Sequence, residues 1–173
     1  MNWNFLAGDY LLRLPVSEQD QNALFEHLQQ HDIAAHIPRL AIVTEAQIEG
    51  ELRRMAQRFQ AREAAFWLVE NVEDKLVARV SVQHINWLQR SAQLVWELNT
   101  DLQLADLQKF MPKLFEFCFQ ELGLHRLEMR LRQAPAHQEL LQGLGFVYEG
   151  TLPAQLEFQS ENIDLEVWSL LAS

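Results

Sequence analysis

The stretch from residue 92 to residue 132 changes its hydrophobic period twice, and this pattern constrains the fold most strongly. Residues 92–98 (AQLVWEL) alternate between the two faces of a strand, and residues 125–131 (HRLEMRL) do so again. Between them lies the apolar stripe of a helix, formed by Leu107, Phe110, Met111, Leu114, Phe115, Cys118 and Leu122. Gly123 follows where such a helix ends. Two strands joined by a helix predict a right-handed parallel β-α-β unit at the core.

The rest of the chain supplies further strands and helices around this unit. Ser17 is expected to cap a first helix, and Thr44 with Gln47 forms a capping box for a second. Residues 31–43 lack a clear period and are interpreted as a loop or a broken helix. A short helix is predicted at 136–142, and strands are predicted at 9–14, 65–70, 75–85, 145–151 and 164–171, the last two joined by a polar loop that contains Pro153 and Asn162. The predicted fold is α/β, with a mixed sheet of about seven strands and about four helices.

Length and composition place the chain among ordinary single-domain proteins. Its 173 residues predict one domain spanning 1–173. No apolar run approaches the roughly 20 residues of a membrane span, and the first residues do not resemble a signal peptide. The single cysteine, Cys118, excludes a disulfide framework and is more simply a buried core thiol than a nucleophile. We therefore expect a cytoplasmic protein without a membrane partner.

The chain is acidic, with a formal net charge of −10. Nucleic-acid binding needs clustered Lys and Arg, so a nucleic-acid partner is not expected. An acidic field would attract a cationic substrate such as an amine or a basic peptide. The simpler interpretation is a well-solvated acidic surface, because charge alone names no substrate. A homodimer is also a prediction at this stage.

Two runs in the second half carry a family resemblance: ELGLHRLEMRL at 121–131 and LLQGLGFVYEG at 140–150. They resemble the GNAT N-acetyltransferase superfamily, and most closely its branch that acetylates the N-termini of ribosomal proteins. The matching residues are Leu122, Gly123, Leu124, His125 and Arg126, followed by Leu144, Gly145, Phe146, Glu149 and Gly150. The resemblance implies a GNAT fold, in which the parallel strands 92–98 and 125–131 splay apart to form a cleft for acetyl-CoA.

The same resemblance implies where acetyl-CoA would bind. Family members hold the pyrophosphate on main-chain N–H groups at the start of the long helix, in a glycine-containing loop. Here that loop is LQLADL, with Gln103 and Ala105 at the glycine positions and a repulsive Asp106 beside them. Ala134 and His137 stand where the family has a cofactor-contacting asparagine and serine. The predicted cofactor contacts are Leu98, Gln103, Leu104, Ala105, Asp106, Leu107, Ala134 and His137, in a degenerate site with weak affinity.

Few side chains near this cleft could move a proton. Glu97 leaves the fourth predicted strand on the face opposite Trp96, and some relatives place a glutamate base on this strand. His84, which we expect to be half-buried on an apolar strand face, is the second candidate. An ion-paired Glu97 and a structural His84 are the simpler alternatives. His27, His31 and His36 have no recognisable metal-ligand spacing and are interpreted as surface histidines, so no metal is predicted.

The resemblance implies an N-acetyltransferase that transfers an acetyl group from acetyl-CoA to a primary amine of a protein N-terminus or a small molecule. Two alternatives stay open. The domain could be a non-catalytic GNAT-fold module that binds or regulates a partner. It could also be an enzyme that uses another acyl-CoA, or one that binds the cofactor through main-chain groups only.

Overall fold

The computed structural model describes residues 1–30, 36–38 and 42–173. The described residues form a mixed α/β fold with eight strands and four α-helices, supplemented by a 3₁₀ turn and a π-helical turn around α3. Their bounds are β1 Phe5–Ala7, β2 Tyr10–Arg13, α1 Ser17–Leu28, α2 Glu45–Gln60, β3 Ala65–Glu70, β4 Leu76–Asn86, β5 Ser91–Leu98, η1 Leu104–Asp106, α3 Leu107–Glu116, η2 Phe117–Glu121, β6 Arg126–Leu131, α4 Pro135–Gly143, β7 Val147–Phe158 and β8 Glu161–Leu171.

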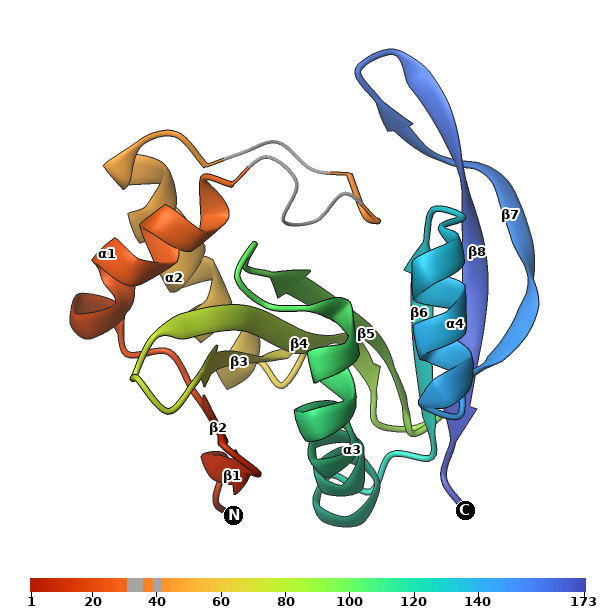
Figure 1. Cartoon of the computed structure of the whole chain (residues 1–173), viewed down its shortest axis with the longest axis horizontal. Helices are drawn as coiled ribbons and strands as arrows, with labels where there is room; N and C mark the ends of the chain where they lie inside the picture. The colour runs from red at the N-terminus through yellow and green to blue at the C-terminus, as the bar shows by residue number, and fades with distance from the viewer. Residues whose placement is uncertain (31–35, 39–41) are drawn as a thin grey trace.

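All eight strands belong to one sheet, in the order β1-β2-β3-β4-β5-β6-β8-β7. Strands β3, β4 and β5 form the predicted antiparallel meander, and β5 and β6 form the predicted parallel pair. Figure 1 shows β5 and β6 close together at the bottom of the view and separated toward the top. The parallel pair, predicted from the two alternating runs, and its splay, implied by the family resemblance, are therefore confirmed.

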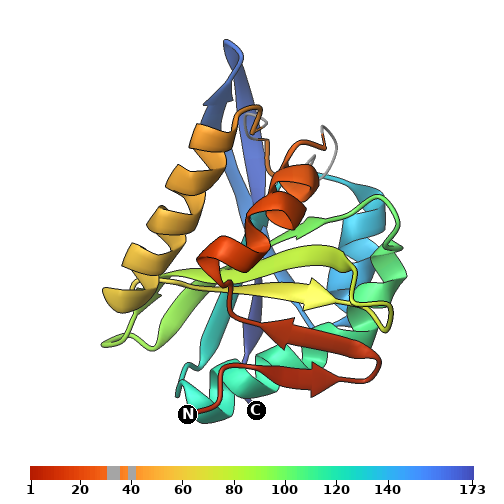
Figure 2. The ribbon, with the colours of Figure 1, turned by 90° about the vertical axis from the view of Figure 1, so that its left-hand side faces the viewer.

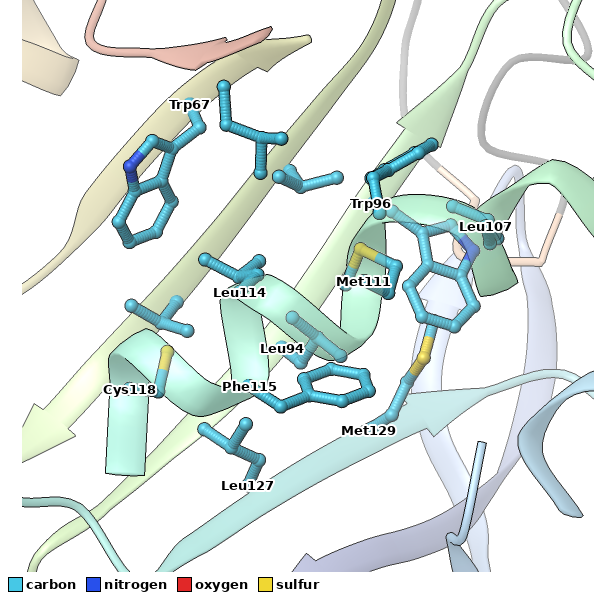
Figure 3. Packing of buried hydrophobic residues seen from close by; sticks show 14 of the residues in the cluster. Trp67, Leu94, Trp96, Leu107, Met111, Leu114, Phe115, Cys118, Leu127 and Met129 are labelled. Carbon is cyan, nitrogen blue, oxygen red and sulfur yellow. The ribbon is translucent and has the colours of Figure 1, made fainter. Parts of the chain in front are cut away.

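Helices cover both faces of the sheet and enclose two apolar cores. Figures 1 and 2 show α1 and α2 together on one side and α3 on the other. The core beneath α1 and α2 is built on Leu24, Ile48, Leu52 and Phe66. The larger core lies under α3, where Figure 3 shows Leu114 and Phe115 against Leu94 of β5 and Leu127 of β6. The predicted stripe is buried, because Leu107, Phe110, Leu114 and Cys118 are all 0 % exposed.

The long helix predicted after residue 104 is divided into three parts. A 3₁₀ turn precedes α3, and a π-helical turn follows it. Pro112 lies inside α3, where its ring removes one main-chain N–H from the helical ladder. Gly123 then adopts φ +70°, a left-handed conformation that glycine reaches without strain, and so ends the helix as predicted.

Two predictions in the first half of the chain need correction, and one is confirmed. A short strand, β1, precedes the first predicted strand and pairs with it, which raises the sheet to eight strands. Ser17 makes no capping bond; instead the Asp20 carboxylate accepts the N–H of Val16 at 2.5 Å and binds Arg13. The Thr44–Gln47 capping box is confirmed.

The predicted polar loop around Pro153 is also wrong, because strands β7 and β8 continue through it as a long hairpin. β7 is an edge strand, and Pro153 lies where its register against β8 shifts between Leu152 and Leu156. An edge strand at a bulge tolerates proline, since no ladder bond is lost there. The turn at Gln159 and Ser160 has positive φ at both residues, which matches the twist of a tight hairpin.

Most of the loop predicted at 31–43 lies outside the described residues. Within the part of the chain that the structure describes, no helix is long and apolar enough to cross a membrane.

Candidate functional site

The candidate site begins where β5 and β6 separate. The two strands pair over only three positions, from Ser91 opposite Arg126 to Gln93 opposite Glu128. Beyond Gln93, the rest of β5 runs on beside β4, while β6 runs beside β8. The strand edge of β5 that would continue the parallel ladder is therefore open along the splay.

The main-chain groups that face this opening can be identified from the register of β4 and β5. The N–H of Asn99 donates to the carbonyl of Val77 at 2.7 Å, which turns the odd-numbered residues of β5 toward β4. Antiparallel strands direct alternate residues to opposite sides. Leu94, Trp96 and Leu98 therefore direct their main-chain N–H and C=O groups into the splay.

His36 bridges the splay from the segment between α1 and α2. Its main-chain carbonyl accepts the N–H of Arg132, just past the end of β6, at 2.8 Å. Its imidazole donates to the main chain of Trp96 on β5. One residue thus connects the two diverging strands, and it is only 6 % exposed.

Three aromatic rings meet at this bridge. The His36 and His137 rings stack with centroids 4.7 Å apart, and Trp96 lies 6.1 Å from His36 and 6.4 Å from His137. Figure 3 shows the Trp96 ring next to Met111 of α3 and Met129 of β6, and all three residues are buried. We refer to His36, Trp96 and His137 as the ring cluster.

The ring cluster contains buried polar atoms that need a partner. His36 Nε2, Trp96 Nε1 and His137 Nε2 are buried and have no hydrogen-bond partner among the described residues. Buried polar groups are nearly always satisfied, and exceptions mark a bound water, ion or ligand, or a functional role. Three such atoms in one cluster therefore indicate a place for a polar group.

Burial keeps both histidines of the cluster neutral. Burial, with a smaller contribution from the nearby His137, lowers the pKa of His36 to about 4. Burial also lowers the pKa of His137. At neutral pH each ring therefore carries one N–H and one lone pair, and neither carries a full positive charge.

A hollow of ≈ 280 Å³ lies between the start of α3 and α4. Its lining includes Leu104 and Ala105 of η1 and Ala136 of α4, so the two predicted cofactor segments come together here. α4 also approaches α3 so closely that a Cβ on Gly143 would lie 2.8 Å from Nε2 of Gln108. The predicted contact residues differ in exposure: Gln103 and Ala105 are exposed, Leu98, Leu104, Asp106, Ala134 and His137 are half-buried, and Leu107 is buried.

Asp106 occupies the start of the central helix as an internal anion. Its carboxylate accepts the N–H of Gln103 at 3.0 Å and binds the Lys109 ammonium at 2.8 Å. The hydrogen bond from Lys109 lowers the pKa of Asp106, with a smaller contribution from the Gln103 N–H. A negative side chain thus holds one of the main-chain donors that would otherwise receive an external anion.

Glu97 lies on the opposite face of the sheet from Trp96, as predicted, and belongs to a buried ion-pair network. The guanidinium of Arg79 donates to Glu97 Oε1 from Nε at 2.6 Å and to Glu51 Oε1 from Nη1 at 2.6 Å. Arg79 is 7 % exposed and Glu97 is 5 % exposed. Protonating Glu97 would leave Arg79 with one carboxylate in place of two, so this network favours the structural interpretation of Glu97.

His84 is exposed, contrary to the half-buried position that we expected. It adopts φ +51° at the irregularity of β4 between Gln83 and Asn86. This is the end of β4 where β5 and β6 are still paired, whereas Arg79 lies beside Glu97 near the splay. The structure therefore does not bring His84 together with Glu97 or with the ring cluster.

Sequence reasoning identified His137 but missed His36, which was interpreted as a surface histidine. His36 lies in an aperiodic segment, and only tertiary structure brings it between residues 96 and 137. His27, interpreted in the same way, is 1 % exposed and contacts the main-chain carbonyl of Glu97 at 3.1 Å. His31 lies outside the described residues.

Among the residues with described positions, no group of three His, Cys, Asp or Glu could hold a metal ion.

Comparisons with known proteins agree with this architecture. The model of the acetyltransferase (GNAT) domain matches residues 10–147. No curated protein matches the chain. The ribosomal-protein-S5-alanine acetyltransferase of Vibrio fischeri superposes with a TM-score of 0.83 at 20% identity, covering 98% of this chain and 97% of that one.

Two further solved structures are similar over almost their whole length. RimL, a ribosomal L7/L12 α-N-protein acetyltransferase in complex with coenzyme A, has a TM-score of 0.87 at 11% identity and covers 97% of each chain. Spermidine N-acetyltransferase of Vibrio cholerae, in complex with CoA and spermine, has a TM-score of 0.82 at 18% identity and covers 94% of this chain and 95% of that one. Because the family match extends over most of its 173 residues, the chain belongs to the GNAT acetyltransferase domain family.

Proposed function

We propose that the chain transfers an acetyl group from acetyl-CoA to a primary amine, and that the transfer takes place at the β5–β6 splay. The observation that carries this proposal is the open edge of β5 beyond Gln93, facing three buried ring nitrogens that have no partner among the described residues. Similar folds support it, since the three similar structures described above are acetyltransferases of ribosomal proteins or of spermidine.

The residues present fit the acyl end of acetyl-CoA better than its diphosphate end. At the splay, the main-chain groups of Leu94 and Leu98, the main-chain N–H of Trp96 and the ring nitrogens without a described partner can hydrogen-bond to a polar thioester arm. At the helix start, Asp106 already holds the N–H of Gln103. A diphosphate placed there would meet a carboxylate of the same sign.

When bound, acetyl-CoA would supply an activated acyl thioester, and the chain's own residues would orient it and stabilise charge. The Trp96 indole can only donate, so its unpartnered Nε1–H is suited to an oxygen that gains negative charge. The buried rings also exclude water from this point, which strengthens such a hydrogen bond.

The acceptor is proposed to be a primary amine on a peptide or a small molecule. The net charge of −10 favours a cationic amine through the overall field. The proposed location is the cytoplasm, with which the single, buried and unpaired Cys118 is compatible.

A second candidate function is a GNAT-fold module that binds or regulates a partner without catalysis. Two observations favour it. The His36 ring already donates a hydrogen bond to the Trp96 carbonyl, which a thioester arm would otherwise use. The Asp106 carboxylate already accepts the main-chain N–H of Gln103 at the helix start. An enzyme that accepts another acyl-CoA fits the same splay.

Calorimetric titration with acetyl-CoA, followed by a thiol-release assay with spermidine and with a basic N-terminal peptide, tests the proposal. We expect binding and amine-dependent release of free thiol. Absence of both, in protein that unfolds cooperatively, would favour the binding module. Propionyl-CoA in the same assay tests the other-acyl alternative.

Glu97 and His84 stay predictions as proton acceptors. Glu97→Gln keeps the shape and removes the basicity, so a hundredfold or greater loss of turnover is expected if Glu97 is the base. His84→Gln provides the comparison. If both variants retain wild-type turnover, neither Glu97 nor His84 is the proton acceptor.

A further inference from the structure

We propose that His36 is a catalytic residue whose Nε2 accepts the proton that the amine loses during acetyl transfer. This inference deepens the proposed function and rests on it. His36 was not expected from the sequence to have any role at the site. Three observations carry the inference: the tautomer of its ring, its contact with Trp96 of β5, and the absence of any partner for Nε2 within the described structure.

The tautomer follows from the hydrogen bonds. The bond from the His36 ring to the Trp96 main chain raises the pKa of the ring, so it stabilises the protonated form and the ring nitrogen is its donor. Nε2 makes no hydrogen bond to any described residue, so the donor is Nδ1. A neutral imidazole has one N–H and one lone pair, and the lone pair is therefore on Nε2.

The position of His36 suits a proton acceptor. Its donor bond ties it to a main-chain carbonyl on the open edge of β5, and its own carbonyl is tied to Arg132 N–H beyond β6. These two bonds fix the ring between the diverging strands. The Trp96 indole, the one donor-only group of the ring cluster, lies 6.1 Å away between ring centroids. A lone pair and an N–H donor therefore belong to neighbouring rings of a buried cluster.

Neighbouring groups keep the ring uncharged at rest. Among the residues that the structure describes, the titratable groups whose charge acts on His36 are His137 of α4, which stacks on it, and Glu97 on the opposite face of β5. Glu97 favours the imidazolium, but burial and the second imidazole of His137 outweigh it. An uncharged ring has its Nε2 lone pair available at neutral pH.

The step balances in atoms and charge for the neutral amine, so a cationic amine first releases one proton to water. The amine nitrogen forms a bond to the acyl carbon, and the carbon–sulfur bond of the thioester breaks. The nitrogen gives up one proton to His36 Nε2, and the sulfur leaves as a thiolate. The thiolate then takes one proton from the imidazolium, which returns His36 to its neutral form.

The test compares His36→Asn with His27→Gln. The asparagine amide preserves a donor near the position of Nδ1 and removes the basic nitrogen. His27→Gln is the matched control, because His27 is also a buried histidine that contacts a β5 carbonyl, that of Glu97. We expect His36→Asn to lower turnover roughly a hundredfold or more, with acetyl-CoA affinity changed less than about threefold. His27→Gln should retain turnover within about threefold.

A second readout does not depend on activity. In ¹⁵N-labelled wild-type protein at pH 7, the His36 ring should show a protonated Nδ1 and an unprotonated Nε2. The inference is overturned by an Nε2–H tautomer, by a charged ring at pH 7, or by wild-type turnover in a folded His36→Asn protein. If instead the wild-type protein acetylates no amine, the proposed function fails, and this inference fails with it for that separate reason.

Discussion

At the residue scale, Arg79 connects two carboxylates that come from different parts of the chain. It binds Glu97 beside it in the sheet and Glu51 on α2, and all three are largely withdrawn from water. Removing one partner of a buried ion pair costs more than the pair itself contributes, because the remaining charge stays in a medium of low polarity. The network therefore fixes α2 against the sheet face that is opposite α3.

Replacing Arg79 should be strongly destabilising. Arg79→Met keeps much of the volume but leaves Glu51 and Glu97 without their shared cation, so the free energy of unfolding should fall by about 3–5 kcal/mol. Urea titration measures this change. Lys75→Met is the control, because Lys75 pairs with Asp101 at the exposed surface and its loss should leave the midpoint unchanged. Equal effects of the two variants would contradict the proposed importance of the network.

Glu51 predicts how stability depends on pH. Burial alone would raise its pKa, but the hydrogen bond from Arg54 and the charge of Arg79 outweigh burial and lower the pKa to about 2. A carboxylate with a depressed folded pKa contributes stability that is complete above its ordinary pKa, near 4.5, and is lost as the pH falls toward 2. Urea titrations between pH 3 and pH 6 should show a shallower decline in Glu51→Gln than in the wild type. Parallel curves would argue against this assignment.

At the element scale, α3 is held by the apolar stripe that the sequence already displayed. Leu114 is 0 % exposed and packs in the core between α3 and the sheet. Leu114→Ala should lower the free energy of unfolding by about 2–5 kcal/mol, because it leaves a cavity. Leu88→Ala, at a position that is 89 % exposed, provides the control and should change little. A Leu114→Ala protein as stable as the control would mean that the stripe is not a core.

The start of the central helix gives a second prediction at this scale. Asp106→Asn keeps an acceptor for the N–H of Gln103 but removes the negative charge, so the affinity for coenzyme A should rise roughly three- to tenfold. Pantetheine lacks the diphosphate, and its binding should not change. Calorimetry with both ligands measures the difference. Equal shifts for the two ligands, or none for either, would place the diphosphate elsewhere.

The elements themselves could largely be predicted from the sequence, because hydrophobic period reports which face of a strand or helix is buried. The parallel pair, the meander, α2 with its capping box and α4 all follow from local patterns. The three-residue β1 is too short to show a period, and the extension of β7 past Pro153 depends on an edge position that local sequence does not reveal.

The site could be predicted only in part, because its groups come from distant segments. Residues 103–107 and 134–137 were placed by their family resemblance, and the structure brings them together across one hollow. The ring cluster combines residues 36, 96 and 137, and no local pattern links them. His36 in particular has its tautomer set by a contact 60 residues away in sequence.

At the scale of the whole molecule, the described part of the fold leaves the β5 edge open along the splay and places the ring cluster there. The acidic surface and the splay together suit a cationic amine, whereas the homodimer stays a prediction that light scattering can test. The proposed binding mode places the acyl end of acetyl-CoA at the ring cluster.

The measurement that tests this claim most directly is an NMR titration of the tryptophan indole N–H signals with acetyl-CoA. The Trp96 Nε1–H has no partner among the described residues, whereas Trp67 donates to Trp3 and Trp87 donates to Arg62. Trp96→Phe assigns the signal. We expect the Trp96 signal to shift with saturation while those of Trp67 and Trp87 stay in place. Saturable binding of acetyl-CoA with an unmoved Trp96 signal would contradict the account.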